Sequence, residues 1–310
     1  MKYLPFIDGK YSTSPGLYLT GKAEQTADRL IFQIDENYAE YIGNKLSGRK
    51  ENIHKYYCEK DLYPQTAATV NRYIAHHLVK EYPEVFSLQE NDGQYLFLNS
   101  KTGEHLQCSD DWLHVAGNTY LSLLDALSSQ VQEDVAICQL QGDKDWMAAI
   151  HLCSPNHWDA RDKIGRPFDA VHAIVPGMEK TIQHYPKMFQ SILNKGPFTR
   201  FAWGISTDAR LNHHPEPPPG VDPIYWYGRK IGEGDYDIFI RVERQSLVGF
   251  PEANAFFFAI RTYFYPVSDL DVQEKKALCT AVETMPEASQ KYKGLYGKAR
   301  ILKEMLSPDH

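Results

Sequence analysis

Residues 236–265 read YDIFIRVERQSLVGFPEANAFFFAIRTYFY, and this stretch decides the class of fold. Two segments in it, Tyr236 to Gln245 and Ala255 to Tyr265, are rich in the β-branched and aromatic residues that favour strands. A connection containing the turn-forming sequence Gly-Phe-Pro-Glu joins them. The stretch therefore predicts two neighbouring strands of an antiparallel sheet.

Three further strand segments precede this pair. Residues 135–140 and 146–152 are separated by a turn sequence and predict a β-hairpin, and residues 198–205 predict a third strand. Residues 178–194 have helical spacing and lie between the second and third strands, with Pro186 as a kink or a break. Five strands with inserted helices predict an α+β fold around an antiparallel sheet.

Apolar residues at helical spacing predict helices on both sides of this core. The expected helices cover residues 22–46, 64–80, 110–131 and 272–306, and an additional short strand covers residues 95–99. We expect one compact unit in three parts: an N-terminal helical extension (1–132), the core (133–268) and a C-terminal helical segment (269–310).

A long irregular segment, residues 212–234, separates the third and fourth strands. Four of the five positions from 215 to 219 are prolines, which excludes both a helix and a central strand there. Loops of this length in compact domains are usually functional, and the aromatic residues that follow favour an ordered loop or a lid.

The composition is that of a soluble globular protein. The 310 residues are 43% hydrophobic and 24% charged, the net charge is −7, and no segment is rich in lysine or arginine, which argues against a nucleic-acid partner. No segment approaches the roughly 18 consecutive apolar residues of a membrane span. The first residues lack the apolar core and cleavage site of a signal peptide, so we expect a cytoplasmic protein.

Residues 154–178, SPNHWDARDKIGRPFDAVHAIVPGM, hold two histidines in different settings. His157 has polar and charged neighbours, whereas His172 has apolar neighbours and precedes a Pro-Gly turn. Imidazole packs poorly among apolar side chains but is a good ligand for a buried iron. His172 is therefore the expected axial ligand of a haem. His184 on the following helix is the main competitor, and a solvated or turn-bonding role is expected for His157.

The chain resembles the haem-dependent oxidative N-demethylase family. Three sequence blocks carry the resemblance: residues 154–178, Arg200-Phe-Ala-Trp203, and Arg241-Val-Glu-Arg-Gln-Ser-Leu247 followed by Phe258-Ala-Ile-Arg-Thr-Tyr263. Their order and spacing match the family, as do the N-terminal segments PGLYL (15–19) and FQIDENYAEYI (32–42), so the resemblance covers nearly the whole chain. The five predicted strands also match the antiparallel order of the PAS-like core that this resemblance implies.

The resemblance implies a haem b protein that is the catalytic alpha subunit of an amine-oxidising system. The implied reaction is O2-dependent oxidative N-demethylation of a small secondary amine such as dimethylamine. Electrons would come from NADPH through separate reductase subunits that carry FMN and a 2Fe–2S centre. The chain contains no G-x-G-x-x-G motif and no P-loop, so sites for these nucleotide cofactors are expected on the partner subunits.

The strand over residues 238–247 carries the expected catalytic residues. Side chains alternate along a strand, so Arg241 and Glu243 share one face and Arg244 lies on the other. An arginine over the haem can donate to iron-bound oxygen, and a carboxylate can hold a cationic amine, because a buried charge needs a partner. Alternation alone does not say which arginine points inward. The alternative is a solvated charged face with an internal ion pair.

Other side chains of the three blocks are candidates for binding the haem propionates or for completing the polar surroundings of the iron. Guanidinium groups suit this role because they match a carboxylate with two parallel hydrogen bonds. These candidates are Arg200, Trp203, Lys163, Arg166, Arg261 and Tyr263.

The five cysteines never form a C-x-x-C pair, which excludes covalent haem attachment and disfavours an iron–sulfur cluster in this chain. Cys153 precedes the histidine block and leaves thiolate ligation of the iron as a minor alternative. Two other functions remain open, a haem-based gas or redox sensor and a haem-binding protein without catalysis. The chain has no recognisable output domain, which counts against a sensor.

Overall fold

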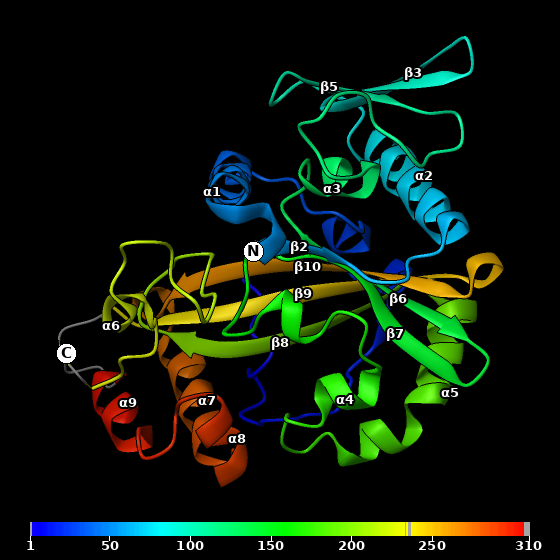
Figure 1. Ribbon diagram of the computed structural model, residues 1–310. Coiled ribbons are helices and arrows are strands. Elements are labelled where there is room, and N and C mark those ends of the chain that lie inside the picture. The colour runs from blue at the N-terminus through cyan, green and yellow to red at the C-terminus, as the bar shows by residue number, and fades with distance from the viewer. Residues whose placement is uncertain (1, 233, 235–236, 307–310) are drawn as a thin grey trace.

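A seven-stranded antiparallel sheet forms the centre of the computed structural model, which describes residues 2–232, 234 and 237–306 (Figure 1). The strand order is β1-β8-β9-β10-β6-β7-β2. The strands are β1 (Tyr18–Leu19), β2 (Tyr57–Glu59), β6 (Asp134–Gln141), β7 (Lys144–His151), β8 (Phe198–Ser206), β9 (Phe239–Phe250) and β10 (Ala255–Pro266). The predicted pair β9 and β10 lies at the middle and is paired from Ala255↔Phe250 to Pro266↔Phe239.

Helices cover both sides of this sheet (Figure 1). On one side lie α1 (Tyr38–Tyr56), α2 (Pro64–Glu81), α3 (Leu123–Ser128) and a second sheet of β3 (Phe86–Asn91), β4 (Gln94–Asn99) and β5 (Glu104–Cys108). On the other side lie α4 (Phe168–His172) and α5 (Glu179–Lys195). The helices α7 (Val272–Glu283), α8 (Glu287–Tyr292) and α9 (Ala299–Met305) lie at one end of the sheet. The short helix α6 (Pro223–Trp226) lies in the proline-rich loop. Single 3-10 turns occur at Thr20–Lys22, Thr26–Arg29, Ala160–Asp162, Pro251–Ala253 and Val267–Asp269.

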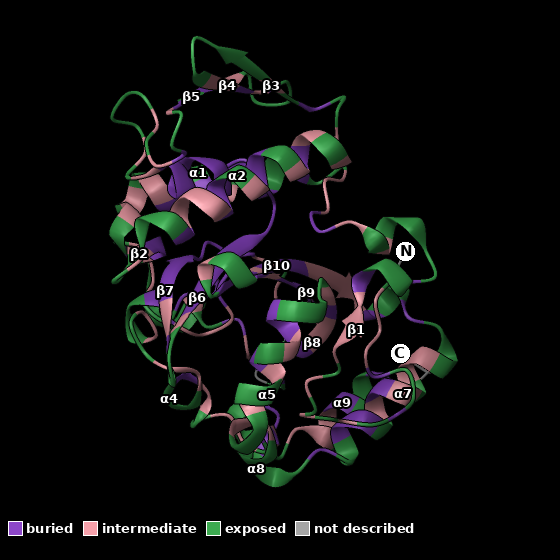
Figure 2. Cartoon of the chain, turned by 90° about the vertical axis from the view of Figure 1, so that its right-hand side faces the viewer, coloured by how far each residue is buried: buried purple, intermediate pink, exposed green. Residues whose placement is uncertain are grey.

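Alternation along β9 separates two kinds of side chain. Ile240 and Val242 pack into a core with α7 and α9, and Val248 packs into a second core with α2 and α3. On the opposite face Leu247 packs against α5, whereas Glu243 remains half-buried. Figure 2 shows the buried residues concentrated in the large sheet and on α1 and α2. One end of this second face is therefore closed by α5, and the charged end is not sealed by apolar side chains.

The structure confirms the five core strands and the helices predicted over residues 64–80 and 178–194. Pro186 lies inside α5 without ending it. The C-terminal helical stretch is divided into three helices, and residues 212–234 are irregular apart from α6. The first residue of the predicted fourth strand, Tyr236, lies outside the described residues.

The N-terminal part was predicted less well. The helix expected over residues 22–46 begins only at Tyr38, because the preceding segment is extended and its backbone N–H groups bind distant carboxylates. The N–H groups of Ile31 and Phe32 donate to the Glu81 carboxylate at 2.7 and 3.0 Å. In residues 110–131 only α3 is helical, and the sheet β3-β4-β5 was anticipated in one strand alone. The first 132 residues also supply β1 and β2, the two edge strands of the large sheet.

No helix within residues 2–232, 234 and 237–306 combines the length and the apolar content needed to cross a bilayer.

Arg244 fastens the extended N-terminal segment to the sheet. Its side chain is 1% exposed, and its Nη2 donates to the carbonyl oxygens of Asp28 at 2.9 Å and Leu30 at 2.6 Å. Its Nη1 donates to the Ser246 hydroxyl at 2.9 Å. A buried guanidinium needs such acceptors, and here the backbone of a segment without regular structure supplies them.

We expect Arg244→Leu to lower the free energy of unfolding by about 3 kcal/mol, because it leaves buried carbonyl groups without donors. Urea denaturation followed by circular dichroism measures this loss. The matched control is Arg300→Leu, which removes an exposed pair with Glu304 and is expected to change stability by less than about 0.5 kcal/mol. Equal losses in the two variants would contradict the anchoring role of Arg244.

Candidate functional site

A cluster of charged side chains lies on the half-buried face of the central strands. Arg200 of β8 pairs in register with Gln245 of β9, and Ala202 pairs with Glu243, so these residues share one face of the sheet. Arg200, Ala202 and Glu243 keep partial exposure. The strand β1 pairs only with Phe198 and Thr199, so β8 has no second neighbouring strand at Arg200 and Ala202, and apolar side chains do not seal this part of the face.

Glu243 is the acidic centre of this cluster. Its side chain is 15% exposed, its Oε2 accepts a hydrogen bond from Gln245 Nε2 at 2.9 Å, and its Oε1 lies 3.6 Å from Arg241 Nε. The negative charge of Glu243 also acts on three other cations and favours their charged forms, namely Lys163, Arg200 and Lys293.

These three cations are poorly compensated. The Nε of Arg200 is buried and has no hydrogen-bond partner in the described chain. Burial lowers the pKa of Lys163 and of Lys293 to about 8. Lys163 Nζ lies 3.7 Å from the centre of the Trp158 ring, and Lys293 Nζ donates to the carbonyl oxygen of Trp203 at 2.6 Å.

Together with Arg241, these three side chains place four positive charges around one carboxylate, an excess of three. Partly buried cations are costly unless they are paired, so the arrangement favours an anionic ligand.

His172 lies beside this cluster, at the end of α4. Its Nδ1 is 2.8 Å from the carbonyl oxygen of Phe168, one helical turn earlier. A carbonyl oxygen only accepts, so Nδ1 carries the proton and Nε2 keeps its lone pair. Burial lowers the pKa of His172 to about 4, and the charges of Lys163 and Arg200 act in the same direction. His172 is therefore neutral at neutral pH and offers Nε2 as a ligand atom, as a metal requires.

Arg241 shares the face of Glu243, and it also anchors two loops. Its Nη2 donates to the carbonyl oxygen of Ser154 at 2.5 Å, and its Nη1 donates to that of Leu211 at 3.3 Å. Its Nε faces Glu243 and has no hydrogen-bond partner among the described residues. The structure thus brings together five of the predicted residues: His172, Lys163, Arg200, Arg241 and Glu243.

Four of the predicted residues lie on the opposite face of the sheet, because side chains alternate along each strand. Arg244 binds the N-terminal segment, as described above. Arg261 pairs with Asp35 at 2.7 Å, and the Tyr263 hydroxyl donates to the side-chain oxygen of Gln33 at 2.8 Å. Trp203 packs in the core with α7 and α9. The structure does not bring these four to the cluster.

Arg166 is exposed and also lies apart from the paired groups of the cluster. Conversely, Lys293 was missed, because it lies in the C-terminal segment outside the three sequence blocks. No signal in the sequence distinguishes it from the other lysines there.

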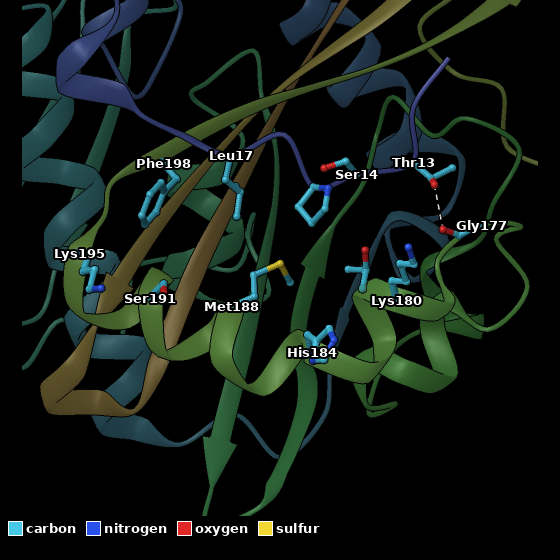
Figure 3. A pocket seen from close by; sticks show the side chains of 12 residues that line it. Thr13, Ser14, Leu17, Gly177, Lys180, His184, Met188, Ser191, Lys195 and Phe198 are labelled. Atoms are coloured by element: carbon cyan, nitrogen blue, oxygen red, sulfur yellow. Dashed lines mark hydrogen bonds between the residues drawn. The ribbon is translucent and has the colours of Figure 1, made fainter. Parts of the chain in front are cut away.

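His184 belongs to another hollow (Figure 3). This pocket of about 590 Å³ lies between residues 13–17, α5 and the start of β8, and Leu17, Met188 and Phe198 provide its apolar lining. Thr13 donates to the carbonyl oxygen of Gly177 at 2.8 Å across one end of it. His184 is exposed in this pocket, whose lining residues include none of Lys163, Arg200, Glu243 and Lys293.

The other two alternative ligands are enclosed by protein. The ring of His157 is half-buried rather than solvated, and it stacks on His213 with ring centres 5.4 Å apart. Burial and the nearby charge of Arg229 lower the pKa of His157 to about 2. Burial raises the pKa of the Cys153 thiol, which disfavours the thiolate that iron would require.

A second group with metal-ligand chemistry consists of Asp159, His214 and Glu216, whose ligand atoms lie within 4.8 Å of one another. Arg161 Nη2 bridges the two carboxylates at 2.6 and 2.5 Å. The His214 Nδ1 lies 3.0 Å from the backbone nitrogen and 3.1 Å from the carbonyl oxygen of Glu216, and its Nε2 lies 3.3 Å from Asp159 Oδ2. This group is therefore an ion-pair network centred on Arg161.

One family model matches this chain. It is described as haem-dependent oxidative N-demethylase, alpha subunit-like, and it matches residues 22–301, or 280 of the 310 residues. The matched region includes the whole charged cluster and His172.

The lowered pKa of Lys163 predicts a pH dependence of stability. Its pKa in the folded protein is about 8, below the ordinary value of 10.5. Above pH 8 the unfolded chain therefore holds more protons, so this group makes the free energy of unfolding rise with pH. In the haem-free protein we expect Lys163→Met to flatten that rise between pH 8 and 9.5, as measured by urea denaturation.

The matched control for Lys163→Met is Lys187→Met, which removes an exposed lysine of α5. The pH profile of this control should run parallel to that of the parent protein. A parallel profile for Lys163→Met as well would show that Lys163 is solvated rather than buried beside Glu243.

Proposed function

The chain belongs to the haem-dependent oxidative N-demethylase, alpha subunit-like, family, and we propose that it is the haem b-binding catalytic subunit of such an enzyme. The proposed reaction is O2-dependent N-demethylation of a small secondary amine such as dimethylamine. One observation carries the proposal: a neutral His172 with a free Nε2 lies beside partly buried cations that outnumber their one carboxylate, Glu243. Haem b offers an iron that His172 Nε2 can bind and two propionates that can pair with the cations.

The topology supports a PAS-like core for this subunit. Numbered along the chain, the five strands from β6 to β10 have the spatial order 2-1-5-4-3, with α4 and α5 inserted between the second and the third. This is the arrangement expected from the family resemblance. His172 and the cluster around Glu243 lie between these inserted helices and the sheet.

Each residue of the cluster has a role in this proposal. His172 would hold the iron through Nε2, while the hydrogen bond from Nδ1 to Phe168 fixes the ring orientation. Lys163 and Arg200 would pair with the propionates, with Lys293 close to the same carboxylate centre. Bound haem supplies the oxygen chemistry and the electron transfer.

Glu243 would bind the cationic amine. Once the propionates neutralise the surrounding cations, the Glu243 carboxylate is left to pair with an ammonium group, and Gln245 keeps it oriented. The free Nε of Arg241 provides a donor beside it. The description of the family as alpha subunit-like supports further subunits, which we propose to be reductases with FMN and a 2Fe–2S centre, supplied by NADPH.

We expect His172→Ala to abolish the Soret band of the haem-loaded protein, or to weaken haem affinity at least tenfold, without changing the far-ultraviolet circular dichroism. The reason is that His172 is the neutral histidine beside the cation cluster. The control is His184→Ala, which should load haem like the parent protein. Retention of haem by His172→Ala and its loss in His184→Ala would move the site to the pocket of Figure 3.

We expect dimethylamine to perturb the ferric Soret spectrum, and Glu243→Gln to weaken this response by roughly ten- to a hundredfold in Kd, because a charged hydrogen bond contributes about 1.5–3 kcal/mol. Titrations with dimethylamine and with a neutral isostere measure the effect. The exposed Glu252, replaced by Gln, serves as the matched control. Equal responses to the neutral isostere and the amine would contradict a demethylase and favour another haem function.

A further inference from the structure

The half-buried Asp208 and the buried His213 form a pair at the far side of Arg241. The Nε2 of His213 is 2.7 Å from Asp208 Oδ1, and the His213 ring is 1% exposed. The Nδ1 of the same ring lies 3.5 Å from Arg241 Nη1. A guanidinium has only donors, so Nδ1 carries the lone pair and Nε2 carries the proton that binds Asp208. His213 is thus a neutral acceptor aimed at Arg241.

The segment that contains His213 is hydrogen-bonded to the histidine block. The His213 N–H donates to the carbonyl oxygen of Pro155 at 3.2 Å, and the His157 N–H donates to the carbonyl oxygen of His213 at 3.0 Å. Arg241 binds both segments, through Ser154 and Leu211. The position of the His213 ring relative to Arg241 is therefore fixed from two sides.

Gly228 has no side chain, and the Asp208–His213 pair occupies the space that a side chain there would need. A Cβ at this position would lie 2.6 Å from His213 Nε2 and 3.0 Å from Asp208 Oδ2. The first distance is shorter than real Cβ contacts and the second is tighter than most of them, so a side chain here would displace the His213 ring and press on the carboxylate. The close packing of Gly228 against Asp208 and His213 is thus a second observation, independent of their hydrogen bonds, that the fold specifies the positions of this pair.

The contacts of Arg241 explain what the pair can do. Both Nη atoms are occupied by carbonyl oxygens, by the Thr262 hydroxyl at 3.3 Å and by His213, so only Nε faces Glu243, at 3.6 Å. Without His213, Nη1 keeps only the Leu211 carbonyl while Nη2 keeps Ser154 and Thr262, so the guanidinium can turn about Nη2 toward both carboxylate oxygens, because the two-pronged pair is the preferred geometry. That direct pair would occupy the carboxylate and exclude an ammonium group.

We propose that Asp208 and His213 are a positioning pair that holds Arg241 back from Glu243 and so keeps the Glu243 carboxylate free for a cationic ligand. Neither residue contacts Glu243, and both act through Arg241. The inference rests on the proposed function for the identity of the ligand. The restraint on Arg241 itself is a property of the chain and can be tested without an amine.

The experiment compares His213→Leu with His213→Asn in the full-length, haem-loaded protein. Asparagine keeps an acceptor near the position of Nδ1, whereas leucine removes it. We expect His213→Leu to raise the Kd for dimethylamine about tenfold and His213→Asn to raise it less than threefold. Gly228→Ala should resemble His213→Leu, and Gly43→Ala on α1, where a Cβ meets nothing within 4 Å, is its control.

A double-mutant cycle separates positioning from a general loss of structure. In a Glu243→Gln background, His213→Leu should leave the remaining amine affinity within twofold, because the carboxylate it protects is gone. Additive losses, or equal losses in His213→Asn and His213→Leu, would overturn the proposal.

Thermal unfolding supplies a readout that needs no amine. If the freed Arg241 pairs with Glu243, that new pair offsets part of the damage, so His213→Leu should lower Tm less in the parent than in the Glu243→Gln background. Equal shifts in Tm would show that Arg241 does not move toward Glu243. If the parent protein ignores amines but the shifts in Tm differ, the proposed substrate fails and the positioning pair stands.

Discussion

Hydrogen bonds from three buried arginines hold the irregular segments of this protein onto its sheet. Arg241 binds the loops at Ser154 and Leu211, Arg244 binds the extended segment at Asp28 and Leu30, and Arg261 pairs with Asp35. All three lie on the two central strands and are at most 2% exposed. Guanidinium groups with five donors each suit this task, because they satisfy several backbone carbonyls at once. The long strands β9 and β10 thus carry the arginines that position the irregular segments, and β9 also carries Arg241 and Glu243 of the charged cluster.

An arginine whose side chain lacks protein acceptors marks the candidate functional site. The Nη atoms of Arg244 donate to protein acceptors, whereas the Arg200 side chain makes no hydrogen bond to the described residues. Lys163 likewise faces an aromatic ring and the distant charge of Glu243. The Nε atoms of Arg244 and Arg261 also lack partners, so the contrast lies in the Nη donors, and a cation whose donors all lack protein acceptors points to a ligand. This contrast supports an anionic cofactor at Arg200 and Lys163 more directly than the number of basic residues does.

The geometry of His172 arises from local structure and distant packing together. The sequence Phe168-Asp-Ala-Val-His172 forms one helical turn after Pro167, which places the ring nitrogen against the Phe168 carbonyl. A helix of five residues is not stable alone. Phe168 stabilises it by stacking on His172 and by packing against Tyr185 and Phe189 of α5. The hydrogen bond therefore sets the tautomer, and the aromatic contacts set the position of the ring.

The sequence by itself determined the five core strands, the helices α2 and α5, the family and the unusual setting of His172, because periodicity and local composition encode them. It also determined that Arg241 and Arg244 lie on opposite faces, since alternation is a local rule. Only the tertiary structure decided which face meets the cluster, that Lys293 joins it, and that residues 30–36 are extended rather than helical. The physical reason is that these outcomes depend on partners far away in the chain. Glu81 binds the N–H groups of Ile31 and Phe32, and the packing of α5 against Leu247 determines which end of the sheet remains open.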